Sequence, residues 1–530
     1  MTREAVLVAS GDLRETANRL GWPVQAELER NVEAAFARHG VRIRRGHAID
    51  PATGHGFISS QRMGMEIFGS IDRDAPIVVA EAVWQYSHHV LPGLRRHRGP
   101  ILTVANWDGT WPGLVGMLNI NASLTKMDRA YSSIWSDDLT DEFADAAIVE
   151  WLETGEIVHD TSHVRDLDAA ELPPEALEIG RRLAAELADR MAILGVFDEG
   201  CMGMYNAIID DEYLNPTGIY KERLSQSSLV AEMRQVDGAE ATGAYRWLRN
   251  RGMEFRLGSD GATELTEDQV LDQLRLYIAA ARIADRFGCD AIGIQYQQGL
   301  KDMAPASDLA EGLLNDADRP PVHAREEHRE LFAGRPLPHF NEVDEGSAVD
   351  ALVTNRVWSA LGFDPATTLH DVRWGAQYGE DYVWVFEISG AVPPAHLVGG
   401  YSGAVSERQP PVYFGLGGGT IKGISRPGEI VWSRVFIMDG ALHVDIGRGT
   451  VVELPAAETE RRWQATTPQW PIMHAVLHGV TRDQMMARHR ANHIQVAYGP
   501  DAPSADQALQ AKAAMFHAMG VKVHLCGIEP

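Results

Sequence analysis

The feature that most constrains the fold is an alternation of short apolar runs with helical patterns. Apolar runs bounded by turn residues occupy residues 5–10, 75–83 and 99–106, and a helical pattern fills residues 24–40. Runs of this length, separated by amphipathic helices, are typical of parallel strands that are covered by helices on both faces. The sequence therefore predicts a doubly wound α/β sheet in this first part of the chain.

The same pattern returns after a polar boundary. Residues 159–180 are mostly polar and contain a double proline, which is typical of a linker. Beyond them, residues 266–288 have apolar residues at helical spacing and end in a glycine, and residues 289–297 form a short apolar run. We therefore expect an α/β domain over residues 1–165 and a second one over residues 166–345.

The last third of the chain changes character. Short β runs separated by glycine and proline lie at residues 382–390, 410–417, 428–440 and 441–454, and one more helical pattern follows at residues 506–520. A chain of 530 residues is too long for a single hydrophobic core. The pattern predicts a third, β-rich and barrel-like domain over residues 346–530.

Composition excludes several classes of partner. The chain has 48 basic and 74 acidic residues and a net charge of −26, so its surface repels phosphate backbones and anionic lipid. It lacks both a long uninterrupted apolar run and the basic, apolar, small-residue order of a signal peptide. We expect a cytoplasmic protein with neither nucleic-acid nor membrane partners.

The three cysteines predict no covalent framework. Cys201, Cys289 and Cys526 are far apart and show no CxxC spacing. This arrangement favours buried thiols over disulfides or a thiolate metal cluster.

An acidic cluster opens the predicted helix of residues 339–362. It contains Glu342, Asp344, Glu345 and Asp350. Carboxylates at a helix start often cap the helix and complement its dipole, and this interpretation stands beside that of a ligand site.

Two further carboxylates and one histidine stand in apolar surroundings. Asp371, between His370 and Val372, is either a turn residue or a buried anion that needs a cation, and Glu387 interrupts an apolar strand. His493 stands at the mouth of the alternating strand pattern of residues 494–498, where a backbone hydrogen bond or a metal would satisfy it. Together these groups form an oxygen-rich set with one nitrogen, which suits Mn²⁺, Mg²⁺ or Fe²⁺ better than structural Zn²⁺.

At these residues the sequence resembles the superfamily of L-fucose isomerase and L-arabinose isomerase. The similarity is carried by residues 341–349 (NEVDEGSAV), 369–374 (LHDVRW) and 491–499 (ANHIQVAYG), and more loosely by residues 106–124 and 198–210. The resemblance implies two Rossmann-like α/β domains, a C-terminal β-barrel domain, and a metal-dependent aldose–ketose isomerase. It also implies a homo-oligomer, a trimer or hexamer, in which Trp84 of one chain closes the pocket of a neighbour.

The resemblance assigns roles residue by residue. It implies that Glu342 and Asp371 are both metal ligands and catalytic carboxylates, that His493 is the third ligand, and that Asn492 contacts the substrate. Arabinose-type enzymes have a second metal histidine where this chain places Glu387, which favours a fucose-type site. We keep Glu387 as a substrate-binding candidate.

A hydrophobic wall and a strand-end amide complete the predicted site. Metal-bound carboxylates are weak bases unless apolar side chains exclude water, and Trp84, Trp374 and Trp470 are candidates for that wall beside the alternative of ordinary core packing. Gln295 follows a strand end in the second domain, where open α/β sheets bind ligands.

The resemblance implies an intramolecular oxidoreductase that interconverts an aldose and its ketose through a cis-enediol, with a divalent metal, most simply Mn²⁺, and a small sugar as substrate. Paired carboxylates and a metal site are the groups that this chemistry needs. Two alternatives remain: a non-catalytic sugar-binding protein of the same fold, and a metal-dependent sugar epimerase or lyase.

Overall fold

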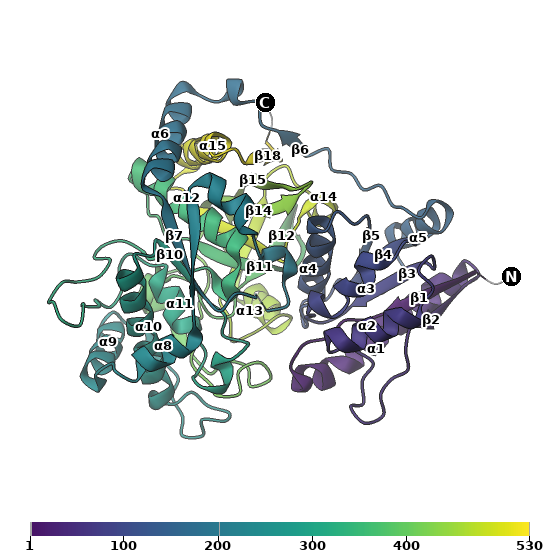
Figure 1. The fold of residues 1–530 in the computed structure, drawn as a ribbon, viewed down its shortest axis with the longest axis horizontal. Helices are drawn as coiled ribbons and strands as arrows, with labels where there is room; N and C mark the ends of the chain where they lie inside the picture. The colour runs from purple at the N-terminus through teal and green to yellow at the C-terminus, as the bar shows by residue number, and fades with distance from the viewer. Residues whose placement is uncertain (1–2, 201, 529–530) are drawn as a thin grey trace.

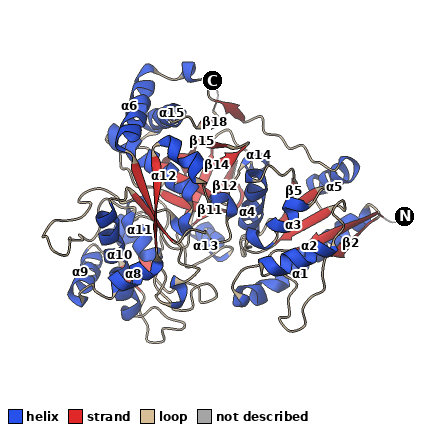
Figure 2. Cartoon of the chain, in the orientation of Figure 1, coloured by secondary structure: helices blue, strands red, loops and turns tan. Residues whose placement is uncertain are grey.

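The computed structural model describes residues 3–200 and 202–528 as a mixed α/β protein with three principal sheets (Figures 1 and 2). Cys289 and Cys526 are buried free thiols, as expected, and Cys201 lies outside the described residues. Within the described residues, no helix is long and apolar enough to cross a membrane.

The first sheet has five parallel strands in the order β2-β1-β3-β4-β5. Its strands are β1 (Arg3–Val8), β2 (Val41–Arg45), β3 (Ile77–Glu81), β4 (Ile101–Asn106) and β5 (Ser132–Ser136). One face packs on α1 (Glu15–Arg38) and α5 (Glu142–Thr154), and the other on α2 (Gln61–Ser70), α3 (Leu91–Arg96) and α4 (Gly113–Lys126). Because helices cover both faces, the strands are apolar along their whole length.

The second sheet is smaller, with three parallel strands in the order β10-β7-β8. These are β7 (Ala192–Phe197), β8 (Ile219–Leu224) and β10 (Ala291–Ile294). Residues of α8 (Gln226–Met233), α9 (Gly238–Asn250), α10 (Glu267–Phe287) and α11 (Asp308–Leu314) share one core with this sheet, and α6 (Pro174–Arg190) shares a second core with it. A four-residue helix, α7 (Asp211–Leu214), precedes β8.

The third sheet is mixed and has eight strands in the order β14-β17-β11-β12-β16-β15-β18-β6. These are β6 (Val164–Asp166), β11 (Thr368–Tyr378), β12 (Asp381–Glu387), β14 (Gly428–Met438), β15 (Ala441–Val451), β16 (Ile472–Leu477), β17 (His493–Tyr498) and β18 (Lys522–Cys526). The sequence predicts a barrel-like domain here, and what the structure contains is this mixed sheet. An additional pairing of β14 with β15 joins the two ends of its first six strands.

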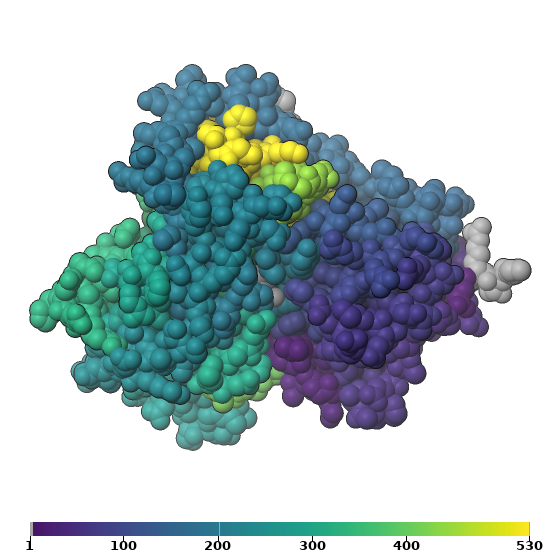
Figure 3. Space-filling view, viewed as in Figure 1, coloured from purple at the N-terminus to yellow at the C-terminus, as the bar shows by residue number. Residues whose placement is uncertain are grey.

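Segments far apart in sequence meet around the third sheet. β6 pairs with β18, and α6 lies against α15 (Ala502–Ala518), which is yellow in Figure 1. The helix α12 (Glu345–Leu361) precedes β11, and α13 (Ala456–Gln464) and α14 (Arg482–Arg488) connect strands of the third sheet. β9 (Glu254–Phe255) pairs with β13 (Val405–Ser406) in a separate ribbon. In the space-filling view the purple N-terminal part abuts the teal and green parts (Figure 3). The boundaries expected at residues 165 and 345 stay a prediction.

A glycine sets the approach of α4 to the first sheet. A Cβ on Gly113 would lie 2.8 to 2.9 Å from three backbone atoms of Ala82, just beyond the end of β3. Backbone cannot move aside as a flexible side chain can, so this position tolerates only glycine without a shift of the helix.

We predict that Gly113→Ala destabilises the protein by roughly 1 to 3 kcal/mol, the usual cost of overpacking. Gly243→Ala is the matched control, since Gly243 lies inside α9 and nothing stands within 4 Å of its would-be Cβ. That control is expected to stabilise the helix by about 0.5 to 1 kcal/mol. Thermal melting of the two variants measures the difference, and equal melting temperatures would contradict the packing argument.

Candidate active site

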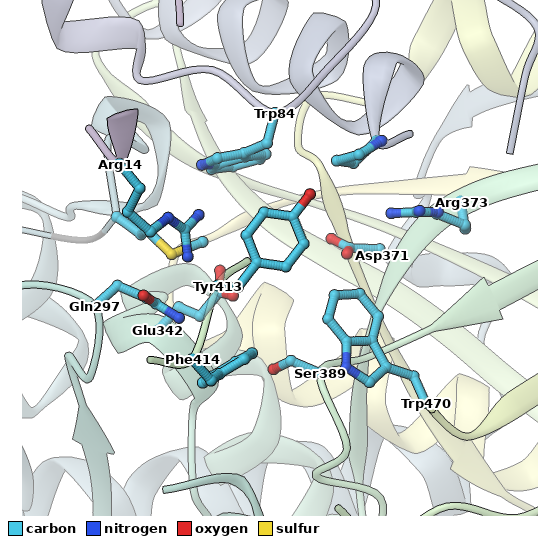
Figure 4. A pocket seen from close by; sticks show the side chains of 12 residues that line it. Arg14, Trp84, Gln297, Glu342, Asp371, Arg373, Ser389, Tyr413, Phe414 and Trp470 are labelled. Carbon is cyan, nitrogen blue, oxygen red and sulfur yellow. The ribbon is translucent and has the colours of Figure 1, made fainter. Parts of the chain in front are cut away.

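A pocket lies where the three sheets meet (Figure 4), with about 430 Å³ of space not filled by atoms, its open mouth included. Arg14 and Trp84 reach it from loops that follow the carboxyl ends of β1 and β3. These strands are neighbours, and the chain turns to opposite sides of the sheet after them. Ligands of open α/β sheets bind at such a switch point, so the pocket stands where the fold favours one.

Glu342 enters the pocket from a strained backbone segment. Glu342 and Val343 both have left-handed backbone angles, with φ of 58° and 55°. This conformation is unfavourable for side chains with a Cβ, above all for a β-branched one, and such strain clusters at functional sites. Gln295 contributes to holding the segment, because its Nε2 donates a hydrogen bond to the carbonyl of Glu342 at 3.1 Å.

Strand register brings Asp371 beside His493. Asp371 of β11 pairs with His493 of β17 on one side and with Glu387 of β12 on the other. Residues directly opposite each other on neighbouring strands have Cβ atoms about 5 Å apart and share one face of the sheet. Residues more than a hundred positions apart in sequence are thus placed side by side by backbone pairing alone.

His493 is the centre of the polar contacts. It is buried, with its Nδ1 2.8 Å from Asp344 Oδ2 and its Nε2 3.4 Å from Asp371 Oδ1 and 3.6 Å from Glu342 Oε2. Burial by itself lowers the pKa of His493, but the hydrogen bonds and charges of Asp344 and Asp371 outweigh it and raise the pKa to about 10. The protonated imidazole is therefore the cation that faces the surrounding carboxylates.

Burial also acts on Glu342. It raises the pKa of the Glu342 carboxyl to about 7, with His493 opposing the rise and Asp371 adding to it. A carboxyl group that titrates near neutrality can both accept and release a proton, which is the property needed for general acid–base chemistry.

Each arginine near the pocket already has a carboxylate of its own. Arg14 Nε lies 2.9 Å from Asp12, Arg373 Nε lies 3.8 Å from Glu387, and Arg434 Nη1 lies 2.6 Å from Asp344. Among the described residues, His493 is therefore the one close cationic partner that Glu342 and Asp371 share. With a neutral imidazole, these two carboxylates would leave a charge near −2 at the pocket wall, which matches a divalent cation.

The donor set fits a metal, although no metal centre is shown. Among residues 3–200 and 202–528, no group of three or more histidine, cysteine or acidic side chains is arranged to hold a metal ion. His493 contacts Asp371 and Glu342 at ion-pair distances. Two carboxylates that line the pocket and the imidazole nitrogen that contacts them are nevertheless the ligand types that Mn²⁺ and Mg²⁺ take, so the residues fit the group.

The other predicted residues are spread around this centre. Trp84 and Trp470 line the pocket (Figure 4). Trp470 Nε1 donates a hydrogen bond to Gln409 at 2.8 Å. Trp84 lines the pocket of its own chain, whereas the sequence predicts that it closes the pocket of a neighbouring chain. Asn492 is buried next to His493, with its Nδ2 3.1 Å from the sulfur of Met204.

Gln295, Asn492, Glu387 and Trp374 do not line the pocket. Glu387 is fully buried and accepts a hydrogen bond from the Thr466 hydroxyl at 2.7 Å. Their predicted roles in substrate binding stay predictions.

The remaining residues that line the pocket were not predicted from the sequence. They are Arg14, Pro112, Met202, Gln297, Arg373, Ser389, Tyr413 and Phe414. Arg14 could have been found as the first long polar side chain after the first strand. Arg373 stands two residues after Asp371, but a β-bulge between Val372 and Trp374 breaks the alternation there, so spacing alone does not place it. Ser389, Tyr413 and Phe414 come from irregular segments, for which the sequence offers no spacing rule.

We predict that the buried Glu387 carboxyl makes stability depend on pH. Burial raises its pKa to about 7, against an ordinary value of 4.5, and Arg373 opposes the rise. Since the folded pKa is the higher one, this contribution to stability is complete below the unfolded pKa and is lost as the pH rises through about 7. Glu387→Gln lacks the contribution.

Melting of metal-free protein at several pH values tests this. Between acid and neutral pH, wild type is expected to lose roughly 1 to 3 kcal/mol more stability than Glu387→Gln, because one pKa unit corresponds to about 1.4 kcal/mol. Parallel pH profiles would show that the Glu387 carboxyl has the same pKa in the folded and unfolded protein and would contradict the assignment.

Comparison with known proteins identifies the C-terminal part of the chain. Residues 408–518 match the family model described as L-fucose isomerase, C-terminal domain, and a search of curated proteins gave no match. The matched segment contains Tyr413, Phe414, Trp470 and His493, which line the pocket or contact its carboxylates. This part of the chain is therefore similar to the C-terminal domain of L-fucose isomerase.

Proposed function

We propose that the protein is a metal-dependent aldose–ketose isomerase of the fucose and arabinose type, with Mn²⁺ as the simplest choice of metal. The observation that carries the proposal is the convergence of Glu342 and Asp371 on His493 Nε2 in one pocket, within 3.4 to 3.6 Å. The family match over residues 408–518 supports an isomerase. We further propose that the chain has two Rossmann-like α/β domains followed by the domain of the third sheet.

Glu342, Asp371 and His493 would hold the divalent cation. When bound, it supplies Lewis-acid stabilisation for negative charge that develops on the two oxygens of the reacting carbons. His493 would take part through Nε2, since its Nδ1 is bonded to Asp344.

The chain's own groups then account for the proton movement. Converting an aldose into its ketose takes the proton from C2, passes through a cis-enediol, and returns a proton to C1, while the proton on O2 moves to O1. Glu342 and Asp371 stand on one wall of the pocket and would serve as the base and acid pair. In Figure 4 the rings of Trp84, Tyr413, Phe414 and Trp470 surround these carboxylates, which limits access of water.

The charges of the pocket favour a neutral sugar over an anionic one. Arg14 and Arg373 line the pocket, but the charge of each is matched by Asp12 and Glu387. Both guanidinium groups can still donate hydrogen bonds, as hydroxyl recognition requires. We propose a small neutral aldose as substrate, and the homo-oligomer expected from the resemblance remains a proposal as well.

We predict that metal-free protein supplied with Mn²⁺ converts at least one of L-fucose, D-arabinose and L-arabinose into its ketose, with deuterium from D₂O entering at C1 of the ketose or C2 of the aldose. Glu342→Gln keeps an oxygen ligand but removes the proton acceptor, so it is expected to lose on the order of 10²-fold or more in rate. Asp308→Asn is the comparison variant and is expected to lose less, because the buried Asp308 carboxyl accepts a hydrogen bond from the pocket residue Ser389 at 2.6 Å but does not line the pocket itself.

The product and label assays separate the alternatives. Sugar binding without turnover would indicate a binding protein, and an aldose epimer or a cleaved product would indicate an epimerase or lyase. Turnover without solvent label, combined with a near-normal rate of Glu342→Gln at normal metal content, would overturn the enediol route.

A further inference from the structure

The carboxylate of Asp344 is fully buried and bonds three groups at once. Its Oδ1 accepts a hydrogen bond from the Ser347 backbone N–H at 3.0 Å, which caps α12. Its Oδ2 lies 2.8 Å from His493 Nδ1 and 2.6 Å from Arg434 Nη1. The acidic cluster at this helix start thus contains a cap, Asp344, next to a pocket residue, Glu342.

Arg434 reaches this carboxylate from β14 through a space that requires glycine. Its Nη1 also donates a hydrogen bond to Ser347 Oγ at 2.9 Å. A Cβ on Gly346 would lie 2.6 Å from the carbonyl oxygen of Val435 and 3.0 Å from Arg434 Nη2. The guanidinium therefore packs directly against the first turn of α12.

A buried ion pair of this kind is poor evidence of stabilisation. Removing two charges from water costs about as much as their attraction returns, and apolar replacements are often neutral or better. The pair does fix the geometry of the site. Arg434 and the backbone N–H of Ser347 together hold the Asp344 carboxylate in one orientation. In that orientation its Oδ2 faces the imidazole of His493.

We propose that Asp344 and Arg434 are positioning residues that act through His493. Asp344 holds the proton of the imidazole on Nδ1 and fixes the ring, so that Nε2 faces Glu342 and Asp371; Arg434 holds Asp344 in place. Carboxylates bonded to the outer nitrogen of a ligating histidine orient it and raise its basicity in just this way. The inference rests on the proposed function, since it assigns His493 a metal to bind.

Two variants remove this support at different points. Arg434→Met removes the cation from Asp344. Asp344→Asn keeps an oxygen for the helix cap, for which asparagine is well suited, but sets an amide nitrogen opposite two donors. Since the cap survives, the second variant keeps the test valid if Arg434→Met fails to fold.

Asp350→Asn is the matched control. Asp350 is also fully buried on α12, and its Oδ1 lies 2.5 Å from Lys512 Nζ and 2.9 Å from Ser433 Oγ, the neighbour of Arg434 on β14. It lies in the same core but has no bond to His493. Its loss should lower the melting temperature without altering the metal site.

Titration of each metal-free protein with Mn²⁺, beside thermal melting, tests the inference. Arg434→Met and Asp344→Asn are expected to bind Mn²⁺ about 10- to 100-fold more weakly than wild type, the usual effect of losing such a partner, whereas Asp350→Asn stays within about twofold. Affinities near wild type in both positioning variants, or an equal loss in Asp350→Asn, would overturn the inference.

The wild type and His493→Ala separate this outcome from failure of the proposed function. If His493→Ala weakens Mn²⁺ binding but the positioning variants do not, the inference alone falls. If wild type and His493→Ala bind Mn²⁺ equally, the metal assignment falls and the inference with it.

Discussion

The arrangement of the pocket depends on the contact between the imidazole of His493 and three carboxylates. Asp344 is hydrogen-bonded to Nδ1 of the ring, while Asp371 and Glu342 lie near Nε2. Each of the three carboxylates is held near the ring by a different element of the backbone. Antiparallel pairing of β11 with β17 places Asp371, a left-handed turn presents Glu342, and the first turn of α12 presents Asp344. Without the ring, three acidic groups would face one another in a buried space, which low polarity makes costly.

Other parts of the fold supply the residues that line the pocket around these carboxylates. The first sheet contributes Arg14 and Trp84 from its switch point, and the irregular segment after β13 contributes Tyr413 and Phe414. Trp84 stands two residues after Ala82, whose backbone is closely approached by Gly113 at the start of α4. The apolar cover is therefore shared between parts of the chain. Trp84 and Pro112 come from the part that forms the first sheet, whereas Tyr413, Phe414 and Trp470 come from the C-terminal part, which also contributes Asp371.

Much of this could be predicted from the sequence, for reasons visible in particular residues. The apolar runs at residues 75–83 and 99–106 are β3 and β4, because strands buried on both faces are apolar throughout. Asp371 and His493 stand out because polar groups in apolar segments need partners, and the resemblance singles out Glu342 from the acidic cluster. The structure brings all three together. Asn492 and Gln295 are predicted to contact the substrate, but in the structure their side chains contact other groups. Asn492 lies against the sulfur of Met204, and Gln295 donates a hydrogen bond to the carbonyl of Glu342.

Other features depend on tertiary structure that local patterns do not encode. The pairing of β14 with β15 joins strands at opposite ends of a six-strand run, and short strand patterns cannot distinguish this from an ordinary hairpin meander. The role of Asp344 was hidden for a similar reason. A carboxylate at a helix start reads as a cap, and it is a cap; only the approach of β14 and β17 shows that its second oxygen bonds His493 and Arg434.

The central claim is that Glu342, Asp371 and His493 together hold one divalent cation. The most direct measurement is the metal content of wild type and His493→Ala by elemental analysis, after loading with Mn²⁺ and extensive dialysis. The account predicts close to one Mn²⁺ per chain in wild type and a large loss in His493→Ala. Equal Mn²⁺ content in the two proteins would contradict it.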